Sequence, residues 1–377
     1  MVNRIWEEGT AHSQVMTTLS YLSDVIGPRV PRSPAMKKAQ EWSSKKLEEW
    51  GLENVVVESC GNVGLGWSNE YLSAHMIEPS YLRNLAYAKP WTSSTSGKVS
   101  GTPVMAVIRT KEDMEKHRGK LKGAIVFTDE PRNTKPAFEP MAKRYTDDDL
   151  EKLKETPIPV KPIDPAPKKD ELKWEDMEEF YRAEEVGLLV DSSSVSRSDY
   201  GTVKVDAYEG NGKDHLTPRR RPRIVMAAEH YARICRIVEM GVPVTLEIEV
   251  RNSLTDQDGE GFNVVGEIPG TDKKDEVVML GGHLDSWTGG TGAVDNAAGC
   301  AVTMEAVRIL KSLGVQPRRT IRIALWTGEE TGFYGSRGYV FRHFGDTDTK
   351  ILENIDWEAY EKNWRRMIGT STKVLAC

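Results

Sequence analysis

A histidine and four carboxylates follow two apolar runs in the last third of the chain. The first run leads into His283-Leu284-Asp285 and then Asp295, and the second leads into Glu329-Glu330. Imidazole and carboxylate groups are ordinary ligands of zinc, which can polarise a carbonyl group and provide a nucleophile at neutral pH. The residue types therefore indicate a metal-dependent hydrolase.

Their positions indicate different roles. His283 is a sound metal ligand, and Asp285 is better placed to orient that imidazole than to bind the same ion. Asp295 has two oxygens and can bridge two ions about 3.5–4 Å apart. Glu329 and Glu330 point in different directions because they are adjacent, so one can bind metal while the other moves protons. The spacing leaves open which glutamate does which.

Taken singly, each residue has a structural explanation. A lone histidine is more often structural than a ligand, Asp295 can cap a helix, and a glutamate pair after a strand is usually solvated surface. Their convergence from two strand ends makes the metal site the better interpretation.

The elements that must position these residues form a strand–helix–strand unit. Val277–Leu280 and Ile321–Trp326 are strand-like, and the pattern predicts a helix from about Asn296 to Leu313 that ends at Gly314. The crossover of such a unit is right-handed in nearly all cases. Both strands then end at one edge of the sheet, where α/β proteins place their sites. A further strand is predicted at Val264-Val265.

The rest of the chain divides into an N-terminal part and a middle module. Residues 1–96 are expected to be mainly helical, with one helix starting at Ser33-Pro34 and closed by Gly51, and to share a catalytic domain with residues 253–377. Residues 97–252 are expected to form a separate β-rich module. Its predicted strands are Val104–Ile108, Ala124–Phe127, Val186–Val190 and the alternating run Val244–Val250, and the proline-rich stretch Pro157–Pro167 is predicted to be a linker.

The composition argues against several kinds of partner. The 377 residues carry a net charge of −6 with a pI near 5.8, which gives no electrostatic case for nucleic acid or an anionic membrane. The basic run Arg219–Arg223 fits a solvated linker because no aromatic residues interleave with it. No apolar stretch approaches the ~20 residues that span a bilayer. The N-terminal residues lack the apolar core of a signal peptide, so an exported form would need a leader.

The four cysteines give no metal or disulfide signal. Cys60, Cys235, Cys300 and Cys377 are widely separated and lack paired ligand spacing. Neither a disulfide framework nor a thiolate zinc site is predicted.

Four motifs together resemble those of the co-catalytic zinc exopeptidases, the family of aminopeptidases and glutamate carboxypeptidases. They are His283-Leu284-Asp285, Asp295–Gly299, Gly328–Glu330 and Gly335–Arg337. The resemblance is greatest to plasma glutamate carboxypeptidase-like members and covers nearly all of residues 1–350. It implies an α/β fold of the zinc-exopeptidase (phosphorylase/hydrolase-like) type, with helices on both faces of a mixed sheet. The middle module resembles the protease-associated domain inserted in many such enzymes.

The resemblance also implies roles for the site residues and a reaction. His283 would bind one zinc ion, Asp295 would bridge two, and Glu330 would bind the other. Glu329 would be the general base, and Asp285 would orient His283. The implied substrate is a peptide cut at a terminal bond, and the implied location is secreted or periplasmic if the N-terminus is incomplete. The end that is trimmed, the side-chain preference and the oligomeric state stay open.

Two ligands of the family pattern, a later aspartate and a distal histidine, have no clear match. His343 follows the glutamate pair too closely, and a surface role is the better interpretation of Asp346, Asp348 and Asp356. We expect the fold to be incomplete at its C-terminus, by truncation or by a frameshift that makes the end of the chain past Tyr360 foreign. The expected consequences are weak zinc binding, little activity and an exposed apolar sheet edge.

Two other interpretations stay open. One is a non-catalytic or inactive protein that keeps the scaffold for binding through its middle module, and the metal content of the purified protein would separate it from an exopeptidase. The other is an acyltransferase like the glutaminyl cyclases, which use a similar scaffold with a single zinc ion. Asp295, followed by the small residues Ala297-Ala298-Gly299, favours two metals.

Overall fold

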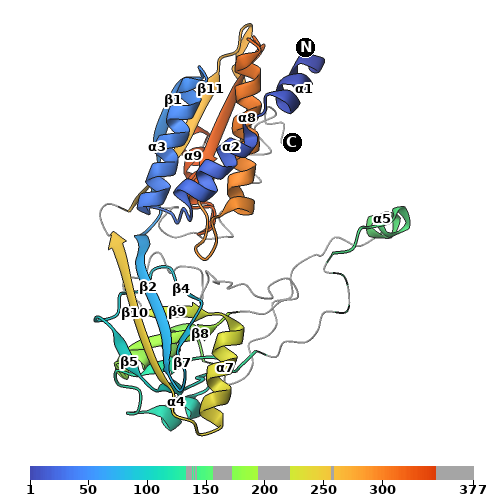
Figure 1. Ribbon diagram of the computed structural model, residues 1–377. Helices are drawn as coiled ribbons and strands as arrows, with labels where there is room; N and C mark the ends of the chain where they lie inside the picture. Colours follow the sequence, from blue (N-terminus) through green and yellow to red (C-terminus); the bar gives the residue numbers. More distant parts are fainter. Residues whose placement is uncertain are drawn as a thin grey trace. The chain divides into compact units, whose positions relative to one another are not determined.

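The chain forms two compact units in the computed structural model (Figure 1). The described residues are 1–132, 138, 140, 142–155, 172–193, 221–255 and 259–344. Among these, the first unit holds residues 1–70 and 252–344, and the second holds residues 71–193 and 221–251. The chain leaves the first unit within β2 (Gly66–Glu78) and returns within β10 (Thr245–Thr255).

A four-stranded mixed sheet, in the order β1-β11-β13-β12, forms the centre of the first unit. β12 and β13 are parallel, whereas β11 is antiparallel to both β1 and β13. The three strands predicted in this region are confirmed, and so is the helix between the two parallel strands. The strands are β1 (Glu53–Asn62), β11 (Glu260–Ile268), β12 (Lys273–His283) and β13 (Arg319–Trp326).

Helices cover both faces of this sheet. Side chains alternate between the faces along a strand, so Val264 and Leu325 point to one side while Val265 and Ala324 point to the other. α3 and α8 pack on the first side (Figure 1), and Tyr339 of α9 packs on the second. The predicted mixed α/β sheet with helices on both faces is confirmed. The helices of this unit are α1 (Val2–Ala11), α2 (Val15–Ser20), η1 (Tyr21–Ile26), α3 (Pro34–Glu49), η3 (Ala293–Ala297), α8 (Ala298–Ser312) and α9 (Tyr334–Phe344).

The N-terminal prediction is correct for α3 and wrong beyond it. The Ser33 hydroxyl accepts a hydrogen bond from the Met36 amide, and Gly51 follows the helix with a φ of 82°, as expected of a capped helix with a glycine end. Residues 53–78, however, form strands β1 and β2 rather than helix. The β-branched run Val55–Val57 favours a strand, and β11 supplies the partner with which it pairs.

The second unit contains a five-stranded sheet in the order β4-β9-β8-β7-β6, in which β6 to β9 are parallel. The predicted strands near 104, 125 and 188 are confirmed, although β6 ends at Met105, before Ile108. The alternating burial of β10 is also confirmed. The elements are β3 (Leu82–Arg83), β4 (Ala86–Ala88), β5 (Val99–Gly101), β6 (Pro103–Met105), α4 (Lys111–His117), β7 (Ile125–Phe127), α5 (Asp147–Lys154), α6 (Trp174–Ala183), β8 (Leu188–Ser192), β9 (Arg223–Met226) and α7 (Ala228–Glu239).

The boundaries of this unit differ from those predicted at one end. It begins at Tyr71 rather than at residue 97, because β3 and β4 belong with its sheets, and it ends at Arg251, next to the predicted boundary. The predicted linker Pro157–Pro167 lies outside the described residues.

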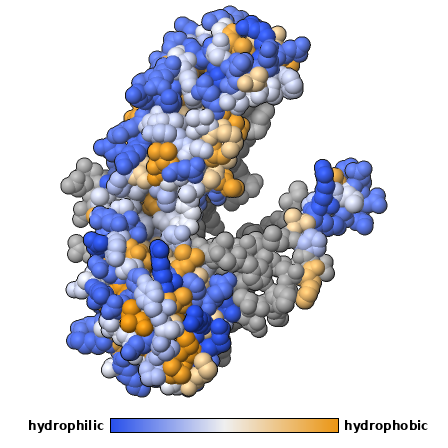
Figure 2. All heavy atoms as spheres, in the orientation of Figure 1, coloured by the Kyte–Doolittle hydropathy of each residue, from blue (hydrophilic) through white to orange (hydrophobic). Residues whose placement is uncertain are grey.

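Strand β12 is an edge of its sheet among the described strands, and three consecutive apolar residues on it are exposed. Val277, Val278 and Met279 keep 39–51% of their surface accessible. In Figure 2, hydrophobic residues form separate patches within a largely hydrophilic surface. Within the described part of the chain, every helix is too short or too polar to cross a lipid bilayer.

Candidate metal site

Two of the three segments that form the site follow the ends of neighbouring parallel strands. His283, the last residue of β12, lies opposite Trp326, the last residue of β13. Glu329 and Glu330 follow β13 after a turn in which Gly328 has a φ of 65°. Glycine adopts this conformation without the steric cost of a side chain. The turn therefore keeps both glutamates close to the strand end that carries His283.

The third segment is the irregular turn of η3 that precedes α8. Asp295 has non-helical dihedral angles there (φ −120°, ψ 95°), and its Oδ1 lies 3.0 Å from Nε2 of His283. At the start of α8, Oδ1 of Asn296 accepts a hydrogen bond from the Gly299 amide at 3.1 Å. Asn296, not Asp295, therefore makes the cap-like contact, and the carboxylate of Asp295 faces the histidine.

His283, Asp295 and Glu330 form a group with the composition of a metal site. Each offers one ligand atom, and these atoms all lie within 4.8 Å of one another. We call these three residues the metal cluster. Glu329 lies beside it, with Oε2 3.9 Å from Nε2 of His283. One imidazole nitrogen and two carboxylates are a donor set that zinc accepts.

Asp285 lies beneath the metal cluster and contacts two of its members. It is fully buried, its Oδ2 accepts a hydrogen bond from the Glu330 amide at 3.1 Å, and its main-chain oxygen lies 3.1 Å from Nδ1 of His283. Its Oδ1 lies 3.7 Å from the same nitrogen and has no hydrogen-bond partner among the described residues. A buried carboxylate oxygen beside Nδ1 suits an imidazole that donates from Nδ1 and binds metal through Nε2.

Carboxylates dominate the electrostatics of His283. Burial opposes protonation of its imidazole, but the nearby carboxylate of Asp285, together with the charges of Glu329 and Glu330, outweighs burial and raises its pKa to about 9. Without metal, His283 is therefore a cation near neutral pH, paired with Asp295. A metal ion can replace that proton as the positive charge of the site.

The two glutamates hold their protons more tightly than an exposed glutamate does. Burial, reinforced by the charges of Asp295 and Asp285, raises the pKa of Glu330 to about 7. Burial also raises the pKa of Glu329, although the charge of His283 opposes this. An excess of carboxylates over cations is the condition that a divalent cation relieves.

Cys300 supports the site but was not selected by the sequence analysis. Its buried Sγ donates to the main-chain oxygen of His283 at 3.0 Å, and burial raises the pKa of the thiol to about 12, so it stays protonated. Its position, one turn into α8 after Asp295, is the signal that could have found it. Cys60, Cys235 and Cys300 are free thiols, and Cys377 lies outside the described residues.

The structure does not bring His343 to the site. Its Nε2 lies 3.1 Å from a carboxylate oxygen of Glu58, and its ring packs on Tyr339, so it pairs with β1 on the α9 face of the sheet. The candidate substitutes Asp346, Asp348 and Asp356 lie outside the described residues.

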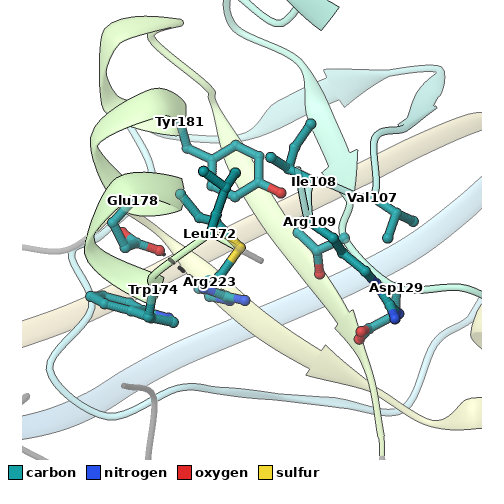
Figure 3. Close-up of a pocket in the computed structure, with 11 residues that line it drawn as sticks. Val107, Ile108, Arg109, Asp129, Leu172, Trp174, Glu178, Tyr181 and Arg223 are labelled. Atoms are coloured by element: carbon teal, nitrogen blue, oxygen red, sulfur yellow. Dashed lines mark hydrogen bonds and ion pairs between the residues drawn. The ribbon is translucent and has the colours of Figure 1, made fainter. Parts of the chain in front are cut away.

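The second unit has a pocket of about 220 Å³ at the carboxyl ends of β6 and β7, next to α6 (Figure 3). Trp174, Met177 and Tyr181 of α6 line it together with Asp129 and Arg223. Its charged groups neutralise each other. Arg223 lies 3.0 Å from Glu178, a contact marked in Figure 3, and 2.8 Å from the buried Asp191, which also lies 3.0 Å from Lys89. We call Lys89, Glu178, Asp191 and Arg223 the buried charge network. The pocket lacks the converging imidazole and carboxylates of the metal cluster.

Comparison with known sequences identifies the C-terminal region. Residues 263–373 match the model of peptidase family M28, and the match passes Tyr360, beyond which we expected the chain to depart from the family. The chain is 26% identical to carboxypeptidase Q of Bos taurus over 344 residues, which are 91% of this chain and 64% of that protein. The chain thus spans less than two thirds of the length of this relative.

Comparison with solved structures identifies the same fold. The peptidase M28 precursor of Shewanella amazonensis SB2B has a TM-score of 0.56 at 23% identity, with 90% of this chain and 70% of that chain covered. BSAP, a zinc aminopeptidase from Bacillus subtilis, has a TM-score of 0.52 at 17% identity, with 89% and 65% covered. The candidate site lies on the strand ends of the region that matches peptidase family M28.

Proposed function

We propose that the protein is a zinc-dependent exopeptidase. The observation that carries the proposal is the metal cluster, in which the ligand atoms of His283, Asp295 and Glu330 lie within 4.8 Å of one another. The printed names of two relatives, a carboxypeptidase and a zinc aminopeptidase, both describe removal of residues from a chain end. They support an exopeptidase without selecting the end.

The proposed metal content is two zinc ions. His283 would hold one ion, Glu330 the other, and Asp295, which is 73% exposed and has two carboxylate oxygens, would bridge them. Bound zinc would polarise the substrate carbonyl and lower the pKa of a nearby water. Carboxylates outnumber cations around His283. The site can therefore accept more positive charge than one proton carries, as two zinc ions would supply.

The proton-transfer role falls to Glu329. Its carboxylate lies beside the metal cluster, 3.9 Å from His283, and its raised pKa brings it nearer to neutrality, which suits a general base. Glu329 takes a proton from the attacking water and returns it to the leaving amine. Asp285 holds the imidazole of His283 and, through the Glu330 amide, the backbone of the second ligand.

We further propose that the second unit corresponds to the protease-associated domain of related enzymes and shapes substrate access. Support comes from its separate compactness and from the resemblance of residues 119–127 and 184–190, which include β7 and the start of β8. In this proposal the unit contributes no catalytic group.

The test combines zinc titration with assays on peptide p-nitroanilides and dipeptides. Zinc at about a hundredfold excess over its Kd should stabilise the protein by about 2.7 kcal/mol, and His283→Ala should abolish this gain. Glu329→Gln should keep the zinc stabilisation but lose at least about a hundredfold in turnover. The surface variant Glu41→Gln on α3 is the matched control for the loss of one carboxylate.

Two results would contradict the proposal. Equal zinc stabilisation of wild type and His283→Ala would remove the metal site. Unchanged turnover in Glu329→Gln, in a preparation that hydrolyses peptides, would remove Glu329 from the base role.

A further inference from the structure

Arg29 makes an unusual set of contacts immediately behind the metal cluster. Its side chain is fully buried, and its guanidinium donates hydrogen bonds to five main-chain carbonyl oxygens. Two of these belong to its own N-terminal region, and three belong to the loop that joins His283 to Asp295. The acceptors are Leu22 (3.0 Å), Gly27 (2.7 Å), Leu284 (2.7 Å), Thr291 (2.9 Å) and Gly292 (2.8 Å).

The backbone of Arg29 binds the same loop. Its amide donates to Oγ of Ser286 at 3.0 Å, and its carbonyl accepts from the Ser286 amide at 3.2 Å. Ser286 is itself fully buried. Contacts at 284, 286, 291 and 292 thus fix both ends of the loop, with Asp285 inside the fixed segment and Asp295 just beyond it.

Gly292 provides an independent observation that this contact is tight. Its φ is 62°, and a Cβ built on it would lie 2.8 Å from a terminal nitrogen of Arg29 and 2.4 Å from Cβ of Ser286. Real Cβ atoms are not found at such separations. The loop approaches the guanidinium so closely that only glycine fits.

The chemistry of the contact argues against a purely structural role. Among the described residues, no carboxylate forms an ion pair with Arg29, although a buried charge is costly unless it is paired or hydrogen-bonded. Its planar guanidinium, which donates from all three nitrogens, is the feature that meets this set of carbonyls. An apolar side chain could fill the space but could not hold two separate stretches of one loop.

We propose that Arg29 is a positioning residue that sets the separation of His283 and Asp295 by fixing the loop between them. The inference rests on the proposed metal site, because its consequence is a higher zinc affinity. Arg29 touches no ligand atom and acts only through the backbone of residues 284–292.

Arg29→Met and Arg308→Met form a matched pair that tests this inference. Arg308 is also a buried arginine of the first unit, but it is paired with Glu305 of its own helix α8 and with Glu8 of α1. Its loss should therefore destabilise the fold without moving the loop. The Kd for zinc is measured by competition titration under conditions where each variant is folded. Amide hydrogen exchange of residues 284–297 measures how well the loop is held in each variant. Arg29→Met should bind zinc at least about tenfold more weakly and exchange faster in the loop, whereas Arg308→Met should stay within about twofold of wild type.

The outcomes separate this inference from the proposed function. Failure of wild type to bind zinc would end both, and wild-type zinc affinity in folded Arg29→Met would end this inference alone. If Arg29→Met does not fold, Arg29→Lys is used to test the positioning role instead. A lysine ammonium, with three donors, cannot reach all five carbonyls. Arg29→Lys should then bind zinc more weakly with faster loop exchange, and unchanged values for both would overturn the inference.

Discussion

Both units gather ionisable side chains on or beside neighbouring strands, but they balance charge in opposite ways. In the buried charge network, Arg223 and Lys89 surround Asp191. Burial would raise the pKa of Asp191, yet the two cations hold it well below its usual range. Around the metal cluster, carboxylates outnumber the single imidazole, and the pKa of Glu330 rises to about 7.

Charge balance separates structural charges from functional ones. A buried network that neutralises itself already has all its partners and needs no ligand. In the metal cluster, excess carboxylates raise the pKa of His283 and burial and neighbouring carboxylates raise the pKa of Glu330. A bound cation would relieve this excess of negative charge, and such perturbed groups are typical of functional sites. The second unit has a pocket beside its neutralised charges, whereas the excess of negative charge lies in the first unit.

The largest effect is expected from disrupting the buried charge network, whose charges compensate each other. Asp191→Ala removes the buried carboxylate that Arg223 and Lys89 share, and removal of one member of a buried ion pair costs about 3–5 kcal/mol. Urea unfolding of the full chain, with hydrogen exchange of β8 and β9 to locate the change, measures this cost. Zinc binding should not change.

The exposed residue Asp275 on β12 provides the control. Asp275→Ala should alter the free energy of unfolding by no more than about 0.5 kcal/mol. A cost below about 1 kcal/mol for Asp191→Ala would mean that the network does not compensate charge as described.

The pH dependence of stability should have opposite signs in the two regions of the metal-free protein. Glu330 has its pKa raised from 4.5 to about 7, so the stabilisation from its protonated form is lost as the pH rises through that window. His283, raised from 6.5 to about 9, contributes stability that is complete below pH 6.5 and is lost as the pH rises toward 9. Asp191, with a lowered pKa, instead contributes stability above its ordinary value of 3.8 that is lost as the pH falls.

Difference curves isolate these contributions. Each raised group can change the free energy of unfolding by at most about 1.4 kcal/mol per pH unit within its window. Unfolding measured from pH 4 to pH 9 for wild type and Glu330→Gln should differ in slope between pH 4.5 and pH 7. Zinc affinity should rise over the same range because the metal competes with the departing protons. Identical slopes for the two proteins would contradict the perturbed carboxyl at Glu330.

The metal cluster was predictable because its signals are local. Each member lies next to the end of a predictable strand or helix, and the βαβ connection alone brings strand ends together. The same reasoning gave Asp285 a role apart from the three residues of the metal cluster, which stays a prediction; in the structure Asp285 contacts two of them.

Arg29 and the buried charge network were not predictable because their partners are distant in the sequence. Arg29 lies in the connection between η1 and α3, and its acceptors are main-chain carbonyls, which every residue type carries and which a sequence pattern therefore cannot reveal. Lys89, Asp191 and Arg223 each look like solvated surface until the sheet of the second unit pairs their strands. The strand β1 was missed for a similar reason, because its partner β11 lies some two hundred positions later in the chain.

The smallest effect is expected from neutral hydrogen bonds beside the charge network. The buried hydroxyl of Tyr231 donates to the main-chain oxygen of Asp129 at 2.7 Å and accepts from its amide at 3.0 Å. Tyr231→Phe removes both bonds and should cost about 1 kcal/mol, because a neutral hydrogen bond contributes only about 0.5–1.5 kcal/mol net. Tyr181→Phe, which removes a single long bond of 3.3 Å to Ala106, should cost less in the same urea experiment. If Tyr231→Phe destabilised the protein as much as Asp191→Ala, the stability of this region would come from its neutral hydrogen bonds, and charge compensation would no longer distinguish the two units.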